Sequence, residues 1–225
     1  MTDDPESARP TPRFGAPALD QTRAAATALR KIAGLLLAQE YPRPSVDELL
    51  VRCAEWERDL TATAPSDVRP RIGTDAASGG RIYLDHAFDI GSYNPAFPEY
   101  EFGSIESERA SGRVNFPLLY EGPPGFVHGG FLAVLADCVV QHHNCATGPA
   151  GKTRSVHLAF RRPAPILTDL TFEIERTTAA RNIDSTVRLR FDDTLLCTAT
   201  INAVAAAPHT LAGARSDARR PDTPN

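Results

Sequence analysis

The sequence lacks the features that mark membrane-spanning, secreted and nucleic-acid-binding proteins. No apolar run approaches the roughly 20 residues that span a bilayer, and the opening MTDDPESARPTPRFGAP has no charged-then-apolar signal pattern. Basic residues are not in excess, since 24 Lys and Arg stand against 28 Asp and Glu for a net charge of -4. Nucleic-acid binding usually needs a basic patch or stripe. We therefore expect a cytoplasmic protein with no membrane span and no nucleic-acid partner.

Cysteine is also scarce. The four cysteines are Cys53, Cys138, Cys145 and Cys197. They show no CxxC spacing, so the sequence suggests neither a zinc ribbon nor a disulfide framework, and buried thiols are the favoured interpretation. Cys145 lies close to His142 and His143, but no further ligand stands at a convincing spacing. We expect no metal site.

What is present fits a soluble globular protein. The 225 residues are 42% hydrophobic and 23% charged, close to the average for such chains. Proline-rich polar residues at 1–17 and 207–225 predict disordered tails. A proline- and glycine-bearing stretch, TAPSDVRPRIGTDAASGG, ends near residue 79 and divides the rest. We predict a helical extension with its linker at 18–79 and one larger domain at 80–206.

The extension has the periodicity of two helices. Apolar residues recur at helical spacing over 19–41, which predicts a first helix. In the second, Ser45 precedes Glu48 by three residues, the arrangement of a capping box. This pattern predicts a helix from Ser45 to about Thr61. We expect the pair to cover the larger domain as a lid or to form an oligomer contact, because their apolar faces need cover.

The larger domain is dominated by strand-like segments. Runs at 81–88 and 103–116 precede a helical segment at 129–144, and four more runs follow at 153–160, 170–178, 183–191 and 195–205. Asp192-Asp193 suits a tight hairpin turn between the last two. The separation of strands from a single helix predicts an α+β fold in which an antiparallel sheet covers that helix.

One acid stands in the middle of this helix. Only Asp137 is polar between Phe131 and Val140, and a helix that is apolar nearly all round must be buried. At 100° per residue, Asp137 and Gln141 share one narrow stripe. A buried carboxylate suits a general base or a nucleophile. The alternative is that Asp137 marks an exposed helix edge or caps a loop. At the helix end, a solvent-facing role is the favoured interpretation for the His142-His143 pair.

The helix start carries His128-Gly129-Gly130. The first amides of a helix have no partner within it and lie at the positive end of the dipole, so this end suits an oxyanion. The glycines could equally serve close packing, and His128 could be a structural histidine. Gly129 and Asp137 are eight residues apart, about 12 Å along one helix. One carbonyl group cannot contact both ends, so a shared reaction requires the acid of a second copy.

These residues resemble a known family. EGPPGFVHGG followed by a helix with LAD, and the later TRSVHLAFRRP, are similar to hotdog-fold thioesterases of the PaaI-like group, especially the EGPPG-bearing mammalian mitochondrial acyl-CoA thioesterase branch. The likeness covers about residues 81–206. It implies a hotdog fold, homodimers or dimers of dimers with shared active sites, and hydrolysis of a fatty or aromatic acyl-CoA to a carboxylic acid and coenzyme A without a cofactor.

The resemblance also implies roles for four residues. The family's catalytic carboxylate falls on Asp137, as general base or nucleophile, and its oxyanion-binding amide falls on Gly129. The histidine before that amide falls on His128, and the water-orienting hydroxyl falls on Thr153. Acid and hydroxyl would come from one subunit, and histidine and amide from the other.

Further positions are candidates for substrate binding. They are Gly130, Phe126, Phe131, Arg161 and Arg162. The phenylalanines suit an acyl channel or simple core packing, and the arginines suit the phosphates of coenzyme A or a solvated turn. Gly122 departs from the many PaaI-like members that carry a polar residue at this position, although the EGPPG branch does without it.

Two other functions remain open at this point. A non-catalytic acyl-CoA-binding protein would keep the fold without turnover. A hotdog dehydratase or hydratase would need an Asp and a His placed together on the helix, and the sequence shows no such paired motif. Coenzyme A and an acyl carrier protein are both possible thioester carriers.

Overall fold

The computed structural model describes residues 20–63, 73–74, 81–82 and 89–205. The predicted tails at 1–17 and 207–225, and most of the predicted linker, lie outside the described residues. The division of the chain into extension and larger domain at residue 79 stays a prediction. No helix in the described part of the chain is long and apolar enough to cross a membrane.

The centre of the structure is a six-stranded antiparallel sheet in the order β3-β4-β6-β7-β8-β5. Its strands are β3 (Tyr100–Ile105), β4 (Arg109–Asn115), β5 (Gly151–Phe160), β6 (Asp169–Ala179), β7 (Asn182–Phe191) and β8 (Thr194–Ala205). β6, β7 and β8 follow one another as hairpins. The predicted turn joins β7 to β8, and Asp192 there has a positive φ of 48°, a conformation that Asp tolerates better than most residues. β5, the strand after the helix, forms one edge of the sheet.

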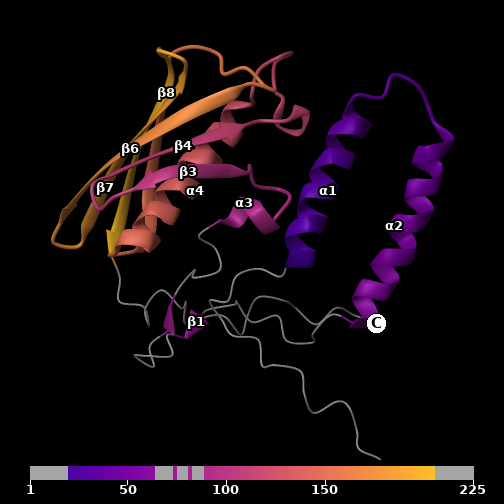
Figure 1. The fold of residues 1–225 in the computed structure, drawn as a ribbon, viewed down its shortest axis with the longest axis horizontal. Helices are drawn as coiled ribbons and strands as arrows, with labels where there is room; N and C mark the ends of the chain where they lie inside the picture. Colours follow the sequence, from indigo (N-terminus) through magenta and orange to yellow (C-terminus); the bar gives the residue numbers. More distant parts are fainter. Residues whose placement is uncertain (1–19, 64–72, 75–80, 83–88, 206–225) are drawn as a thin grey trace, which may run out of the picture.

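The sheet curves around α4 (Gly129–Thr147), as Figure 1 shows. Alternate residues of β6 are buried against the helix, and Leu170, Phe172 and Ile174 are fully enclosed. The helix contributes Leu135 and Val139 to the same core. The strict alternation of β6 and the apolar character of α4 are the period-2 and period-3.6 patterns of a half-buried strand and a buried helix. The predicted α+β arrangement is therefore present.

The region before α4 differs from the prediction of one strand over 103–116. It forms the separate strands β3 and β4, joined by a turn in which the Glu106 amide donates to the Arg109 carbonyl. A short helix α3 (Ile90–Tyr93) precedes them, and a single 3-10 turn, Leu118–Tyr120, leads toward α4. Two further short strands, β1 (Gly73–Thr74) and β2 (Arg81–Ile82), pair only with each other.

Both predicted N-terminal helices are present, as α1 (Asp20–Leu37) and α2 (Pro44–Thr63). α2 begins at Pro44, so the prediction of Ser45 as the capping residue before the helix is wrong. Proline is well suited to the first helical position because its missing N–H would have no partner there. Figure 1 shows α1 and α2 as a hairpin beside the sheet.

Arg30 attaches α1 to the rest of the protein. Its side chain is only 4% exposed, pairs with Glu99 at 3.0 Å, and donates to the carbonyls of Gly91, Phe97 and Asn94. Arg30 thus neutralises Glu99 and satisfies three backbone acceptors around α3. α2, by contrast, has no buried residue. Among the described residues, α1 is attached to the rest of the protein through α3 and the 3-10 turn, and no comparable attachment is seen for α2.

Candidate active site

Three polar side chains meet where α4 faces β5. The Thr153 hydroxyl donates to Asp137 Oδ1 at 2.6 Å, and Gln141 Nε2 donates to the Thr153 oxygen, also at 2.6 Å. All three residues are half-buried. Asp137 Oδ2 accepts no hydrogen bond within the described ranges. The carboxylate is thus held by one oxygen, and the other is left for a further donor.

Local structure explains this meeting. Asp137 and Gln141 are four residues apart, which places them one above the other on the same helix face. Thr153 comes from β5, where the pairing with β8 shifts register between Thr153 and Ser155. Such an irregularity re-aims neighbouring side chains. The sequence-based prediction of one shared stripe for Asp137 and Gln141 agrees with this geometry.

The surroundings of this cluster are partly apolar. Burial, followed by the charge of Asp137, raises the pKa of the Cys138 thiol to about 12, so Cys138 stays protonated and is a poor nucleophile near neutral pH. Gln141 Oε1 is buried and has no hydrogen-bond partner among the described residues. It remains an available acceptor beside Thr153.

The other candidate group lies at the start of α4. His128 is the N-cap residue, and its Nδ1 accepts a hydrogen bond from the Gly130 amide at 3.0 Å. The Gly129 amide donates to no acceptor in the described part of the chain. A Cβ atom at Gly129 would lie 3.1 Å from the Phe160 ring. Gly129 thus lies beside the exposed Phe160 side chain.

The EGPPGF segment forms a compact turn in front of the helix. The Gly125 amide donates to Glu121 Oε1 at 2.6 Å, and Gly125 has a φ of 82°, in the region that favours glycine. Any Cβ at Gly122 would lie 2.8 Å from the Cα of His128. Close backbone packing thus explains why residue 122 is a glycine.

The two candidate groups do not meet within one chain. Asp137 and Thr153 are hydrogen-bonded, whereas Gly129 and His128 lie at the end of the same helix, about 12 Å away by the helical rise. The separation predicted from the sequence is therefore present. Within one chain, the two candidate groups thus lie at opposite ends of one helix segment.

The predicted substrate-binding residues fall in different surroundings. Phe131 packs edge-to-face on buried Tyr120, with ring centroids 4.8 Å apart, while Phe126 is 38% exposed. Arg161 and Arg162 are exposed and directly follow Phe160, whose ring lies beside Gly129. Gly130 is exposed at the helix start.

The interpretation of His142 and His143 as solvent-facing is wrong. His143 is fully buried and contacts the Glu106 carbonyl through Nε2, and His142 is half-buried with its Nδ1 3.2 Å from the Tyr100 hydroxyl. β3 covers His142 through Tyr100 and Phe102, and the turn after β3 covers His143 through Glu106. Within the described ranges, no group of three or more His, Cys, Asp or Glu could hold a metal ion.

A buried arginine beyond these histidines was not predicted. Arg176 donates to Asn144 Oδ1 at 2.8 Å and to the carbonyls of Ser107, Gly148 and Pro149 at 2.9–3.1 Å. It lies on β6 at a core-facing position of the period-2 pattern, which was the signal available in the sequence. This arginine caps the carboxyl end of α4, where the helix dipole favours a cation.

Comparisons with known proteins agree on the fold. A crystal structure described as a thioesterase superfamily protein superposes with a TM-score of 0.69 at 24% identity, covering 84% of this chain and 97% of that one. No protein-family model matches the chain, and no curated protein matches it. The fold is thus the hotdog fold of thioesterase-superfamily proteins, with N-terminal helices added.

Two more distant structures carry similar descriptions. Thioesterase superfamily member 2 from Mus musculus is 14% identical with a TM-score of 0.45, covering 48% of this chain and 82% of that one. A hypothetical thioesterase from Streptococcus pneumoniae, solved with coenzyme A, is 17% identical with a TM-score of 0.46, covering 48% and 90%.

Proposed function

We propose that the protein hydrolyses an acyl-CoA thioester to a carboxylic acid and coenzyme A. The observation that carries this proposal is the Asp137–Thr153–Gln141 cluster, a hydrogen-bonded carboxylate with one oxygen left for a water molecule. The thioesterase-superfamily fold supports the reaction class, and the EGPPG–HGG segment supports a PaaI-like acyl-CoA substrate. The proposal assigns the chemistry to the chain's own residues alone.

Each residue has a defined task in this mechanism. Asp137 takes a proton from water as the water oxygen attacks the thioester carbonyl, and Thr153 orients the water and carboxylate. The Gly129 N–H stabilises the oxyanion of the tetrahedral intermediate. Collapse of that intermediate breaks the C–S bond, and the proton held by Asp137 passes to the departing thiolate. Direct attack by Asp137 on the carbonyl, with a transient anhydride hydrolysed by water, is the alternative route.

Because Gly129 and Asp137 lie apart within one chain, the proposed active site is shared by two copies. β5 is an edge strand that carries the exposed side chains of Val156 and Phe160. If two β5 edges pair antiparallel, the Phe160 end of one copy lies opposite the Thr153 end of the other. Gly129, beside Phe160, would then approach Asp137 of the partner. Arg161 and Arg162 would lie at the same mouth, where they suit the phosphates of coenzyme A.

The test measures thiol release from a panel of acyl-CoA and acyl-carrier thioesters. Asp137→Asn should lower kcat by about 10²- to 10⁴-fold, the range for loss of a general base. Asp184→Asn is the matched control, because Asp184 is also a hydrogen-bonded aspartate, accepting from Asn202 at 2.6 Å, but is exposed elsewhere on the sheet. Coenzyme A binding without hydrolysis of any thioester by the wild-type protein would instead identify a non-catalytic binding protein.

A further inference from the structure

Gln141 has a single side-chain hydrogen bond within the described ranges, and this bond goes to the candidate site. The residue lies one turn beyond Asp137 on α4, and its Nε2 donates to the Thr153 oxygen at 2.6 Å. Asn144, further along the same helix, instead accepts a hydrogen bond from Arg176 at 2.8 Å and thereby joins α4 to β6. The Gln141 amide makes no such structural link.

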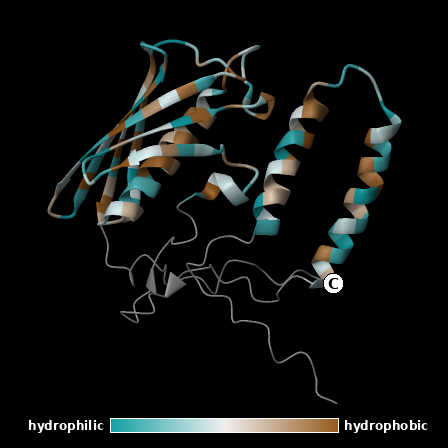
Figure 2. Ribbon diagram, in the orientation of Figure 1, coloured by the Kyte–Doolittle hydropathy of each residue, from teal (hydrophilic) through white to brown (hydrophobic). Residues whose placement is uncertain are grey.

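The other half of the Gln141 amide is unpaired. Its Oε1 is buried and has no hydrogen-bond partner among the described residues. The helix that carries it is largely apolar, and Figure 2 shows hydrophobic residues on α4 and on the strands around it. A buried acceptor without a donor lowers the stability of the fold. A glutamine at this position is therefore not explained by stability, and an unsatisfied buried group of this kind calls for another explanation.

The Thr153 hydroxyl explains why the amide leaves its oxygen unpaired. The hydroxyl has one proton, which it donates to Asp137 Oδ1 at 2.6 Å. A second partner of the Thr153 oxygen must therefore be a donor. The amide meets this requirement only with Nε2 toward Thr153, and Oε1 then faces away from it. With the amide reversed, Oε1 would compete with Asp137 for the same proton.

We propose that Gln141 is a positioning residue for the hydrolysis proposed above, on which this role depends. By donating to Thr153, Gln141 fixes the hydroxyl oxygen and directs its proton to Asp137 Oδ1. Oδ2 then remains the carboxylate oxygen that receives the proton of the attacking water. Gln141 acts through Thr153 and contacts neither the water nor the thioester. The unpaired Oε1 is the stability cost of this arrangement.

The main experiment removes the amide of Gln141 in the full chain. Gln141→Met keeps an unbranched side chain of similar length and removes both the donor and the unpaired acceptor. The kcat for thiol release should fall about 2- to 12-fold, the rate equivalent of one ordinary hydrogen bond. KM should stay unchanged, because the lost contact does not touch the substrate.

The thermal stability of Gln141→Met separates a positioning role from a structural one. Loss of the hydrogen bond to Thr153 is offset by removal of the buried unpaired oxygen, so the melting temperature should be unchanged or higher. A glutamine that only supports the fold would show the reverse, a lower melting temperature with an unchanged kcat.

Gln141→Glu keeps the shape of the side chain and reverses its hydrogen bond. A glutamate carboxylate is ionised at pH 8, so it cannot donate and instead competes with Asp137 for the Thr153 proton. At this pH, the kcat of Gln141→Glu should fall below that of Gln141→Met.

Combination with substitutions of Thr153 tests whether Gln141 acts through the hydroxyl. In a Thr153→Val background, Gln141→Met should cause no further loss of kcat, because the group that it positions is already absent. In a Thr153→Ser background, the loss should match that in the wild-type background. Residues that act through one another show such non-additive effects.

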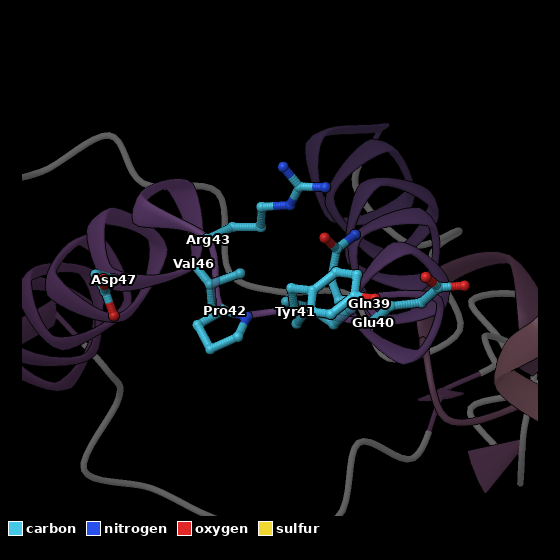
Figure 3. A pocket seen from close by; sticks show the side chains of 8 residues that line it. Gln39, Glu40, Tyr41, Pro42, Arg43, Val46 and Asp47 are labelled. Atoms are coloured by element: carbon cyan, nitrogen blue, oxygen red, sulfur yellow. The ribbon is translucent and has the colours of Figure 1, made fainter.

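Gln39→Met is the matched control. Gln39 also donates one side-chain hydrogen bond, from Nε2 to the Leu35 carbonyl at 2.9 Å, but it is exposed after the end of α1. Figure 3 shows Gln39 among the residues that line a pocket at the turn between α1 and α2, which carry no residue of the candidate site. This variant should release thiol at the wild-type rate.

Three results would overturn the positioning role while leaving the hydrolysis in place. They are a wild-type kcat in Gln141→Met, a kcat at pH 8 in Gln141→Glu that equals or exceeds the wild-type value, and equal losses from Gln141→Met with and without the Thr153 hydroxyl. A wild-type protein that releases no thiol from any thioester would overturn the hydrolysis and the positioning role together. The two failures are therefore distinguishable.

Discussion

The hydroxyl of Thr153 on β5 donates a 2.6 Å hydrogen bond to the carboxylate of Asp137 on α4. This contact joins the edge strand of the sheet to the central helix. Gln141, one helical turn further on, donates to the same hydroxyl oxygen and fixes the direction in which Thr153 gives its proton. The Thr153 hydroxyl therefore accepts a hydrogen bond from Gln141 and donates one to Asp137.

Two substitutions at Thr153 should distinguish the role of its hydroxyl from the role of its side-chain volume. Thr153→Val keeps the volume and removes the donor, so kcat should fall on the order of tenfold or more because Asp137 and its water lose an orienting group. Thr153→Ser retains the donor and should stay close to wild type. Thiol-release kinetics measure both, and a Val variant with wild-type kcat would exclude the hydroxyl from catalysis.

The proposed oxyanion role of Gly129 can be tested at the backbone. Gly129→Pro removes the amide N–H at the first helical position, where proline is tolerated, and the preceding His128 already has φ -63° and ψ 131°, which proline requires of its neighbour. Loss of one oxyanion donor should lower kcat by about 10²- to 10³-fold.

Gly129→Ala is the steric control for that variant. It adds a Cβ atom 3.1 Å from the exposed Phe160 ring but keeps the N–H. Its kcat should be well above that of Gly129→Pro, and equal losses in the two variants would assign the effect to crowding. If the active site is shared as proposed, mixing Gly129→Pro and Asp137→Asn subunits should restore activity, since a mixed dimer would keep one intact site.

The sequence predicted the parts of the fold that repeat with a clear period. β6 alternates buried and exposed residues along its length, and α4 is apolar nearly all round. The Asp137–Gln141 stripe followed from the same geometry. β3 was merged with β4 because β3 is an edge strand without a fully buried residue, and only its first four residues alternate between half-buried and exposed positions.

Contacts between elements were less predictable. Thr153 became a candidate through family resemblance, because nothing in local periodicity shows that a hydroxyl on β5 meets a carboxylate on α4. His143 was taken as solvent-facing because the helix dipole favours an imidazolium at the carboxyl end, whereas the turn after β3 covers it with the Glu106 carbonyl. The burial of Arg176 could have been predicted. In the alternating pattern of β6, Arg176 is the next core-facing residue after Leu170, Phe172 and Ile174.

Loss of Arg176 should destabilise the protein strongly. Arg176→Met removes the donor from Asn144 Oδ1 and from three carbonyls that it satisfies at the end of α4. Buried acceptors left without donors cost about 1–3 kcal/mol each, so the free energy of unfolding should fall by about 3 kcal/mol or more in urea denaturation.

Arg188→Met is the matched control for that loss. Arg188 pairs with Glu175 at 3.0 Å on the sheet surface, with its side chain 31% exposed. Surface pairs of this kind contribute about 0–1 kcal/mol. A similar loss of stability in both variants would mean that removal of a long basic side chain, rather than the helix-end contacts of Arg176, causes the effect.

Acidification should destabilise the folded protein through its buried histidines. Burial lowers the pKa of His143 and of His142 below their ordinary value, and the charge of Arg176 lowers that of His143 further while its contact with the Glu106 carbonyl opposes the shift. The unfolded chain therefore binds more protons than the folded chain as the pH falls past about 6.5. Stability rises with pH wherever the unfolded state binds more protons, so this contribution is present at pH 7.5 and is lost as the pH falls toward the folded pKa values.

His143→Gln tests the assignment, because glutamine can still donate to the Glu106 carbonyl but does not titrate. Urea unfolding of the wild type at pH 7.5 and at pH 5.5 should show a lower free energy of unfolding at the acidic pH, and the difference should be smaller in the variant. His143 Nδ1 is buried without a partner among the described residues. A proton bound to Nδ1 would therefore find no hydrogen-bond acceptor there to stabilise the charged ring. An equal pH dependence in wild type and variant would assign the acid sensitivity to other groups.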